Sequence, residues 1–318
     1  MNSVEHIGHS NIALVKYWGK LDQQIPCNPS LSFTLKNCIT SMKGTSIEFD
    51  RFGLEFSFNA QENSKFRDNI LSRMKRLPIS LPNVKIKIES TNSFPHSSGI
   101  ASSASSMSCY VLILNDLLKL NLSSSELSNY ARLLSGSACR SLGPGFQSWG
   151  RVNYIQNSSD LYSSDVKVHS VFKKLRDTVI IVDSNPKKIS STKGHESMVD
   201  HPYRDARYKQ AKKNHQLMTN ALIDGNWDDF NKITRIEAMS LHALMMSSLE
   251  PYFLLHPKSL EMINLIDQEL GKKNVTYTMD AGANIHLIYD NSYHQKVKSF
   301  LHEHSSHFED FIEDEILI

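Results

Sequence analysis

A run of small side chains from Ser93 to Ser106 carries the strongest chemical signal in the sequence. It follows the alternating residues Val84, Ile86 and Ile88, which predict a strand, and it leads into Met107–Leu120, whose apolar residues recur at helical spacing. Small side chains let a backbone approach a ligand closely, and free N–H groups at the start of a helix attract anions. The segment therefore predicts a phosphate-binding loop, although the Walker A pattern is absent. On composition alone, a serine-rich turn that caps a buried helix is the simpler interpretation.

Charged residues in apolar surroundings mark two further segments. Lys16 and Lys20 lie in a stretch rich in apolar and aromatic residues, and Asp280 lies in a tight loop between the predicted strands Val275–Tyr277 and Ile285–Tyr289. An ammonium group can neutralise a phosphoryl group during its transfer, and a carboxylate can orient or deprotonate a hydroxyl. The alternatives are a solvated lysine at a strand edge and a common turn aspartate.

Two alternating stretches predict a β-hairpin. Residues 47–49 and 54–58 alternate apolar and polar side chains on either side of a turn at residues 50–53. We therefore expect these two strands to pair directly, with one face of the pair buried.

Strands lead in the first part of the chain, and helices lead in the second. The spacing Ser123-x-x-Glu126 is a capping-box pattern and predicts the start of a helix, whereas Thr178–Val182 predicts a buried strand. Strands and helices do not alternate regularly, so the predicted class is α+β. We place a boundary near residue 184, between an N-terminal lobe (1–183) and a C-terminal lobe (184–318). Three helices are predicted in the second lobe, at residues 204–223, 227–249 and 257–270.

The composition fits a globular protein with two lobes. The chain has 318 residues and a formal net charge of +2, and this balance argues against a nucleic-acid-binding protein. No apolar run approaches the ~20 residues that cross a bilayer, and residues 1–10 lack the apolar core of a signal peptide. The four cysteines form no C-x-x-C pair, which argues against a zinc ribbon or a dithiol site. We therefore expect a cytoplasmic protein.

Several segments together resemble one enzyme family. The order Pro-x-x-x-Gly-Ile-Ala-Ser-Ser-Ala, which ends at Ala104, resembles the phosphate-binding motif of the GHMP kinases, the galactokinase, homoserine kinase, mevalonate kinase and phosphomevalonate kinase superfamily. Within it, residues 11–20, 135–141 and 278–284 resemble the N-terminal signature, the substrate-site stretch and the catalytic aspartate loop of the diphosphomevalonate decarboxylases. Residues 190–194 are a weaker match. The segments occur in the family's order, and this favours a phosphate-binding role for the serine loop.

The resemblance implies a fold, a reaction and partners. The fold would be the two-lobed GHMP kinase fold, with a ribosomal S5 domain 2-like N-terminal lobe, a ferredoxin-like C-terminal lobe and a central cleft. The reaction would be ATP-dependent decarboxylation of mevalonate 5-diphosphate to isopentenyl diphosphate, a step of isoprenoid biosynthesis that also releases ADP, phosphate and carbon dioxide. ATP brings Mg²⁺, which needs few protein ligands, so no metal-ligating residue is predicted. A homodimer is also implied.

Three residues match the family's catalytic groups. Asp280 matches the aspartate that orients or deprotonates the 3-hydroxyl, and its charge can stabilise positive character at C3. Lys16 matches the lysine that neutralises the transferring phosphoryl group and keeps Asp280 ionised. Arg140 matches the arginine whose guanidinium fork binds the substrate carboxylate.

Other matches are binding residues. A Tyr17 that only packs beside Trp18, and serines at 135 and 137 that only end a helix, are the structural alternatives. For the substrate the matches are Tyr17, Lys20, Ser135, Ser137 and Asn28, together with Arg140. For the nucleotide they are Asn92, Ser97, Ser98, Gly99, Ala101, Ser102 and Ser103.

The chain also departs from the family pattern. Ala283 stands where the aspartate loop usually has a proline, which puts the order of this loop in question. A small-molecule kinase or decarboxylase acting on mevalonate or mevalonate 5-phosphate remains an alternative, as does a catalytically silent GHMP-fold binding protein. The presence of Lys16, Arg140 and Asp280 favours the decarboxylase. The histidines at positions 302, 304 and 307 are best explained as a solvated helix end.

Overall fold

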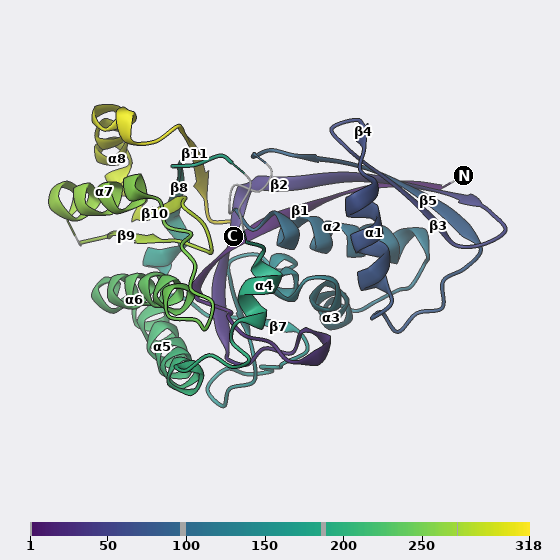
Figure 1. Ribbon diagram of the computed structural model, residues 1–318, viewed down its shortest axis with the longest axis horizontal. Coiled ribbons are helices and arrows are strands. Elements are labelled where there is room, and N and C mark those ends of the chain that lie inside the picture. The colour runs from purple at the N-terminus through teal and green to yellow at the C-terminus, as the bar shows by residue number, and fades with distance from the viewer. Residues whose placement is uncertain (1, 96–99, 186–188, 272) are drawn as a thin grey trace.

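Two β-sheets organise the chain into two lobes (Figure 1). The computed structural model describes residues 2–95, 100–185, 189–271 and 273–318. Helices α1 to α3 lie against the large sheet, and the remaining long helices surround the small one (Figure 1). This mixed architecture confirms the α+β prediction.

The large sheet is built around two long antiparallel strands, β1 and β2. On one edge β2 pairs with β1, and on the other it pairs first with β6 and then with β5. The strand order is β4-β3-β5-β2-β6-β7. The strands are β1 (Asn2–Val15), β2 (Ser30–Glu48), β3 (Gly53–Phe58), β4 (Gln61–Glu62), β5 (Val84–Asn92), β6 (Phe146–Trp149) and β7 (Ser163–Asp165).

The predicted hairpin is wrong in its pairing. Both of its strands exist, as the end of β2 and as β3, but β5 lies between them. β3 pairs with β5 in parallel, from Gly53 opposite Lys85 to Phe58 opposite Ser90. Alternation along a strand fixes which face is buried, and it does not fix which strand lies alongside.

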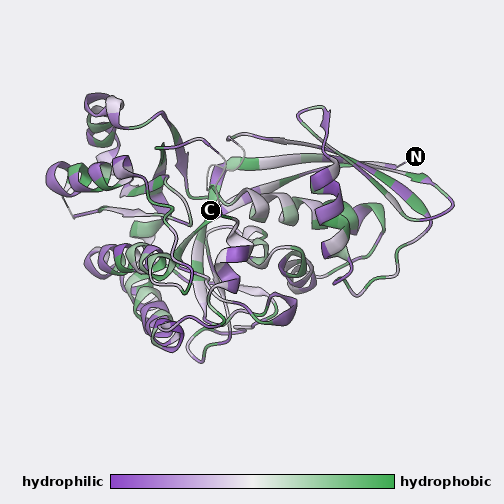
Figure 2. Cartoon of the chain, viewed as in Figure 1, coloured by the Kyte–Doolittle hydropathy of each residue, from purple (hydrophilic) through white to green (hydrophobic). Residues whose placement is uncertain are grey.

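Three helices cover one face of the large sheet: α1 (Ser64–Met74), α2 (Ser102–Leu117) and α3 (Ser124–Leu134). The capping box at Ser123 and Glu126 is confirmed, since each residue bonds the other's backbone N–H. α2 comes very close to β1, because a Cβ on Gly8 would lie 2.0 Å from the carbonyl oxygen of Ser105. Figure 2 shows α2 as white to green, as expected for small and apolar residues packed between the sheet and its neighbours.

The small sheet has the strand order of a ferredoxin-like fold. Its strands are antiparallel in the order β11-β8-β10-β9, which is the fourth, first, third and second strand along the chain. This confirms the fold expected for the second lobe. The strands are β8 (Leu175–Ile181), β9 (Val275–Thr278), β10 (Ile285–Asp290) and β11 (Asp310–Glu315). β8 precedes residue 184, and the division at 183/184 stays a prediction.

Helices cover both faces of the small sheet. Val179 packs in one apolar cluster with residues of α5 and α6, whereas Ile180 packs in another with residues of α7 and α8. The helices are α4 (Ser191–Glu196), α5 (Arg204–Asp224), α6 (Trp227–Met246), α7 (Pro257–Leu265) and α8 (His294–Glu303). Short turns are η1 (Asp22–Gln24), η2 (Gly136–Ser141), η3 (Ser170–Lys174), the π-helical η4 (Ile266–Leu270), η5 (Asn291–Tyr293) and η6 (Ser305–His307).

The last strand joins the two lobes. The Asp314 carboxylate accepts hydrogen bonds from the backbone N–H groups of residues 36, 37 and 38 in β2, at 3.1, 2.8 and 2.6 Å. The N–H of Leu317 donates to the carbonyl of Thr34 at 2.9 Å, and its own carbonyl accepts from Gly145 at 2.6 Å. The lobes are therefore tied by backbone and carboxylate bonds as well as by apolar packing.

None of the helices within the described ranges is long and apolar enough to cross a bilayer.

Candidate active site

A cleft of about 830 Å³ collects most of the side chains selected from the sequence. Both lobes line it: the first through β1, α1, α2 and η2, and the second through α4, α6 and the loop after β9. The predicted residues that line it are Lys16, Tyr17, Lys20, Ala101, Ser102, Ser103, Ser135, Ser137, Arg140 and Asp280.

Lys16 and Asp280 form an ion pair in the wall of this cleft. Nζ of Lys16 lies 2.8 Å from Oδ1 of Asp280, and the lysine is 2% exposed against 27% for the aspartate. Lys16 comes from the end of β1 in the first lobe, and Asp280 from the loop after β9 in the second. The pair therefore exists only when the two lobes are assembled.

The Asp280 loop is held without the usual proline. The N–H of Gly282 bonds the carbonyl of Asp280 at 2.8 Å, and the carbonyl of Ala283 accepts from the Ser259 hydroxyl at 2.6 Å. Oδ1 of Asn284 accepts from the N–H groups of residues 182 and 183 at 2.8 and 3.1 Å. Side chains thus fix the loop that Ala283 had put in question.

Arg140 is a buried guanidinium held by neutral oxygens. It is 2% exposed and donates to the hydroxyls of Ser30 and Ser32 and to the amide oxygen of Asn11. No ion pair between Arg140 and a carboxylate occurs among the residues that the structure describes. Burial lowers the pKa of Arg140, and the nearby charge of Asp280 partly offsets this effect. An arginine desolvated in this way is prepared to bind an anionic ligand group.

Tyr17 and residues 135–137 lie next to each other in the lining of the cleft. The Tyr17 ring packs on Trp149 and on His195, with centroids 4.7 and 4.3 Å apart, and its buried hydroxyl has no hydrogen-bond partner within the described ranges. A Cβ on Gly136 would lie 2.8 Å from this hydroxyl, so only glycine fits there. Burial raises the pKa of Tyr17, so the hydroxyl remains a donor.

The start of α2 faces the cleft. Ala101 precedes the helix with φ of 48°, and its own side chain makes no capping hydrogen bond. The hydroxyl of Ser103 lies 3.3 Å from that of Ser135. The opening N–H groups and the Ser102 and Ser103 hydroxyls thus offer donors for an anion. Ser97, Ser98 and Gly99 lie outside the described residues.

Two predicted binding residues do not line the cleft. Asn28 lies behind Lys16, where its side chain donates to the Lys16 carbonyl at 3.0 Å. Asn92, at the end of β5, accepts from the Thr40 hydroxyl at 2.9 Å. Asn28 thus supports the backbone of Lys16, whereas Asn92 bonds its cross-strand neighbour in the large sheet.

Comparisons with known proteins agree with this geometry. The family model described as the diphosphomevalonate decarboxylase-like N-terminal domain matches residues 8–162, and that of the mevalonate 5-diphosphate decarboxylase C-terminal domain matches residues 178–315. The diphosphomevalonate decarboxylase of Saccharomyces cerevisiae is 31% identical over 315 residues, covering 92% of this chain and 79% of the yeast protein. The chain belongs to the diphosphomevalonate decarboxylase family.

Further relatives support the same family. The Candida albicans diphosphomevalonate decarboxylase is 30% identical over 93% of this chain and 87% of its own length. The mevalonate diphosphate decarboxylase structure from Staphylococcus aureus superposes with a TM-score of 0.85 at 26% identity, covering 99% of this chain and 96% of that one. A complex of MDDEF with MVAPP, AMPPCP and magnesium gives the same TM-score and identity over 98% and 96% of the two chains. These matches confirm the GHMP fold.

This family member has cleft cations that the sequence analysis missed. Arg73, on α1, and Arg76, two residues after that helix ends, line the cleft beside Lys20. Each arginine donates to a carbonyl at the end of α3, Arg73 to Leu134 at 3.1 Å and Arg76 to Leu133 at 3.2 Å. Burial, followed by the charges of Arg76 and Arg73, lowers the pKa of Lys20. These three side chains, Lys20, Arg73 and Arg76, make one part of the cleft lining positively charged, and this part is called the positive end of the cleft below.

α4 forms part of the cleft lining. It includes most of residues 190–194, the segment that matched the family only weakly. Thr192, Lys193 and His195 line the cleft, and a Cβ on Gly194 would lie 2.4 Å from the Trp18 ring. Nδ1 of His195 accepts from the N–H of Gly19 at 3.1 Å. Burial and the charge of Lys20 lower the pKa of His195 to about 3, so its ring is neutral.

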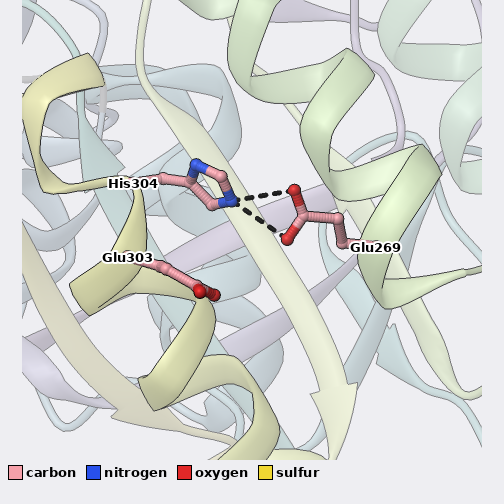
Figure 3. Close-up of side chains that lie close together, drawn as sticks. All are labelled: Glu269, Glu303 and His304. Atoms are coloured by element: carbon pink, nitrogen blue, oxygen red, sulfur yellow. Dashed lines mark hydrogen bonds and ion pairs between the residues drawn. The ribbon is translucent and has the colours of Figure 1, made fainter.

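The C-terminal histidines lie outside this cleft. Nε2 of His304 lies 2.9 and 3.0 Å from the two carboxylate oxygens of Glu269, and Glu303 lies beside them (Figure 3). In the described ranges these three form the one group whose ligand atoms could reach a common metal ion. The bidentate contact with Glu269 accounts for the position of His304.

Proposed function

We propose that Asp280, Lys16 and Arg140 carry out ATP-dependent decarboxylation of mevalonate 5-diphosphate to isopentenyl diphosphate in this member of the decarboxylase family. One observation carries the proposal. A buried guanidinium without a carboxylate partner in the described ranges faces the same cleft as the Lys16–Asp280 pair, which lies 2.8 Å apart. The cleft thus offers a site for a substrate carboxylate next to groups suited to phosphoryl transfer.

In the first step, the 3-hydroxyl of the substrate attacks the γ-phosphate of ATP. Asp280 orients this hydroxyl and accepts its proton as the oxygen–phosphorus bond forms. The Lys16 ammonium lies against Asp280 and neutralises charge on the transferring phosphoryl group. ADP leaves, and the substrate carries a new phosphate on C3.

In the second step, the C3–oxygen bond breaks and phosphate departs with its electron pair. The bond between the carboxylate carbon and the neighbouring carbon supplies the electrons for the new double bond, and carbon dioxide is released. Arg140 holds the carboxylate in place through its two parallel donors until this bond breaks. The Asp280 charge stabilises the positive character that develops at C3.

The diphosphate end of the substrate fits the positive end of the cleft. Lys20, Arg73 and Arg76 offer three cations there, and the Tyr17 hydroxyl offers a neutral donor that lacks a protein partner among the described residues. A monophosphate would leave part of this donor set unpaired, so the arrangement favours the diphosphate over mevalonate 5-phosphate.

ATP and Mg²⁺ are proposed at the start of α2. The N–H groups of the first turn and the hydroxyls of Ser102 and Ser103 fit triphosphate oxygens, and oxygen atoms are the ligands that Mg²⁺ prefers. When bound, Mg²⁺ would neutralise charge on the phosphate oxygens. Among the described residues, the side chains of Ser102, Ser103 and Asp280 could hold it.

One assay separates the proposal from its alternatives. The purified protein is given ATP with either mevalonate 5-diphosphate or mevalonate 5-phosphate, and both ADP and carbon dioxide are measured. We expect equal amounts of the two products with the diphosphate only. Formation of ADP without carbon dioxide would show that the protein is a kinase. If neither product forms, the result would favour a silent binding protein.

Three expectations accompany this proposal. A homodimer is expected from the family resemblance, and light scattering of the purified protein tests it. The N-terminal lobe (1–183) is proposed to bind ATP, and nucleotide-dependent protection of its amides from hydrogen exchange tests this. A cytoplasmic location is tested by fractionation of the source cells.

A further inference from the structure

The backbone of Lys16 is held by side chains of the second lobe. Val15 is the last residue of β1 and pairs with Leu31, so Lys16 lies just beyond the strand ladder. Its N–H donates to Oε2 of Glu237 at 2.9 Å. Its carbonyl accepts from Nη2 of Arg207 at 3.2 Å and from Asn28 at 3.0 Å. Both backbone polar groups of the lysine that pairs with Asp280 are thus bonded to side chains.

Glu237 and Arg207 form a buried, two-pronged ion pair. Nη1 and Nη2 of Arg207 donate to Oε1 and Oε2 of Glu237 at 2.9 and 2.7 Å, and the two residues are 3% and 0% exposed. Asn214 donates to Oε1 at 2.7 Å. Burial raises the pKa of Glu237, but Arg207, Asn214 and the Lys16 N–H outweigh it, and the pKa lies below its ordinary value. The carboxylate is therefore ionised.

Every acceptor position of the Glu237 carboxylate is used. Oε1 accepts from Arg207 and Asn214, and Oε2 accepts from Arg207 and the Lys16 N–H. A carboxylate offers about four such positions. Buried ion pairs often stabilise a fold no more than apolar residues of the same volume, so stability alone does not account for this arrangement.

The same helix also contacts the Asp280 loop. Leu241 lies one turn beyond Glu237 on α6, and therefore on the same face. It packs in one apolar cluster with Ala281, the residue after Asp280, and with Trp18, close to Lys16 in the chain. α6 also packs on β9, the strand that leads to Asp280. α6 thus contacts both of the segments that carry the ion pair.

The geometry assigns Glu237 and Arg207 as positioning residues, which act through the Lys16 backbone to place its ammonium against Asp280 and the transferring phosphoryl group. This inference rests on the proposed function, because it assumes that Lys16 takes part in the chemistry. Neither residue lines the cleft, so neither touches substrate. Small displacements of a catalytic group lower the rate of chemistry far more than they lower binding.

A double-mutant cycle on kcat tests this assignment. Glu237→Gln puts an amide NH₂ against groups that are themselves donors, which displaces the Lys16 backbone. We expect kcat to fall by about 10²-fold, while the KM for ATP changes by less than about threefold. In a Lys16→Ala background, the same substitution should lower kcat by less than about threefold further. A full 10²-fold effect in that background would overturn the inference.

Two further variants keep the test decisive if Glu237→Gln does not fold. Arg207→Lys keeps the positive charge but loses the fork, so it should lower kcat by about tenfold and again have little further effect beside Lys16→Ala. Asp267→Asn breaks the Arg235–Asp267 contact, which joins α6 to η4 away from Lys16, and should leave kcat unchanged. An equal loss of kcat in Asp267→Asn would show that α6 matters only for stability and would overturn the assignment.

The outcomes also separate this inference from the proposed function. If Lys16→Ala alone keeps the wild-type kcat, the proposed role of Lys16 fails, and the positioning role fails with it. If Lys16→Ala is impaired and the two substitutions are additive, only the positioning role fails.

Discussion

Nζ of Lys16 and Oδ1 of Asp280 lie 2.8 Å apart although 264 positions separate the two residues in the chain. The lysine belongs to the first lobe and the aspartate to the second. The two charges that the proposed reaction needs are therefore brought together by the packing of α6 and by the bonds between β11 and β2. Four predictions follow from the site and from its surroundings.

Replacing the catalytic carboxylate should remove turnover and spare nucleotide binding. In Asp280→Asn the side chain keeps its shape but cannot accept the proton of the 3-hydroxyl, so kcat should fall by about 10²–10⁴-fold. Carbon dioxide release measures the loss, and fluorescence of a bound ATP analogue measures the affinity. Asp290→Asn is the matched control, since Asp290 only caps η5. A kcat within tenfold of the wild-type value would contradict the role of Asp280 as the group that accepts the proton of the 3-hydroxyl.

Arg140 should matter through its shape as well as through its charge. Arg140→Lys keeps a cation but loses the fork, and the two lost charge-assisted bonds correspond to about 3 kcal/mol, or about 10²-fold in kcat/KM. Steady-state kinetics with varied mevalonate 5-diphosphate measures this. Arg151→Lys, at an exposed position, is the control. Unchanged kinetics in Arg140→Lys would mean that the substrate carboxylate binds elsewhere.

A methyl group at position 136 should disturb substrate binding. In Gly136→Ala the new Cβ would lie 2.8 Å from the Tyr17 hydroxyl, which must move. Losing one hydrogen bond should raise the KM for mevalonate 5-diphosphate by about tenfold and change kcat less. Gly53→Ala is a suitable control, because its Cβ would find only ordinary contacts at 3.5 Å or more. An unchanged KM in Gly136→Ala would show that the Tyr17 hydroxyl does not bind the substrate.

Two buried histidines should make the fold sensitive to acid. Burial lowers the pKa of His215 to about 4, and burial with the Lys20 charge lowers that of His195 to about 3. Below pH 6.5 these histidines are protonated in the unfolded chain but stay neutral in the folded protein. The free energy of unfolding therefore decreases as the pH falls from 6.5 toward 4. At pH 5 each histidine should cost about 2 kcal/mol of unfolding free energy relative to a group that does not titrate.

Urea unfolding at pH 7 and pH 5 measures this effect. His215→Gln should be less stable at pH 7, because His215 bonds Ser148 and Tyr154, both at 2.9 Å. It should nevertheless lose less stability than the wild type between the two pH values. The exposed His302→Gln should behave as the wild type. Equal losses in wild type and His215→Gln would contradict the prediction.

The sequence predicted the chemistry of the site better than its surroundings. Lys16, Asp280 and Arg140 were found because their neighbours resemble family segments, and the structure gathers all three in one cleft. Arg73 and Arg76 were missed because arginines on a polar helix and in the turn after it are typical of a solvated face. Only the packing of this segment against the end of α3 brings them to the cleft. Burial of a charged side chain depends on distant elements that local patterns do not contain.

The misplaced partner of β3 has a related cause. Residues 54–58 form a strand, as predicted. The short turn before them suggested that this strand pairs with the end of β2, but β5, which follows β4 and α1 in the chain, lies between the two. Glu237 could not be singled out either, because an acidic residue in a helix is ordinary until Arg207 is seen opposite it.

The attachment of residues 314–317 to β2 has a consequence for biosynthesis. Asp314 and Leu317 complete hydrogen bonds of residues 34–38 and of Gly145, the latter a few positions after Arg140. A ribosome makes a chain from its N-terminal side, so residues 34–38 and Gly145 of the first lobe lack these partners until residues 314–317 have been translated. Thr34, whose hydroxyl also bonds the Arg140 carbonyl, is therefore fully paired only after residue 317 has been made, and the Lys16–Asp280 pair can form only after residue 280 has been made.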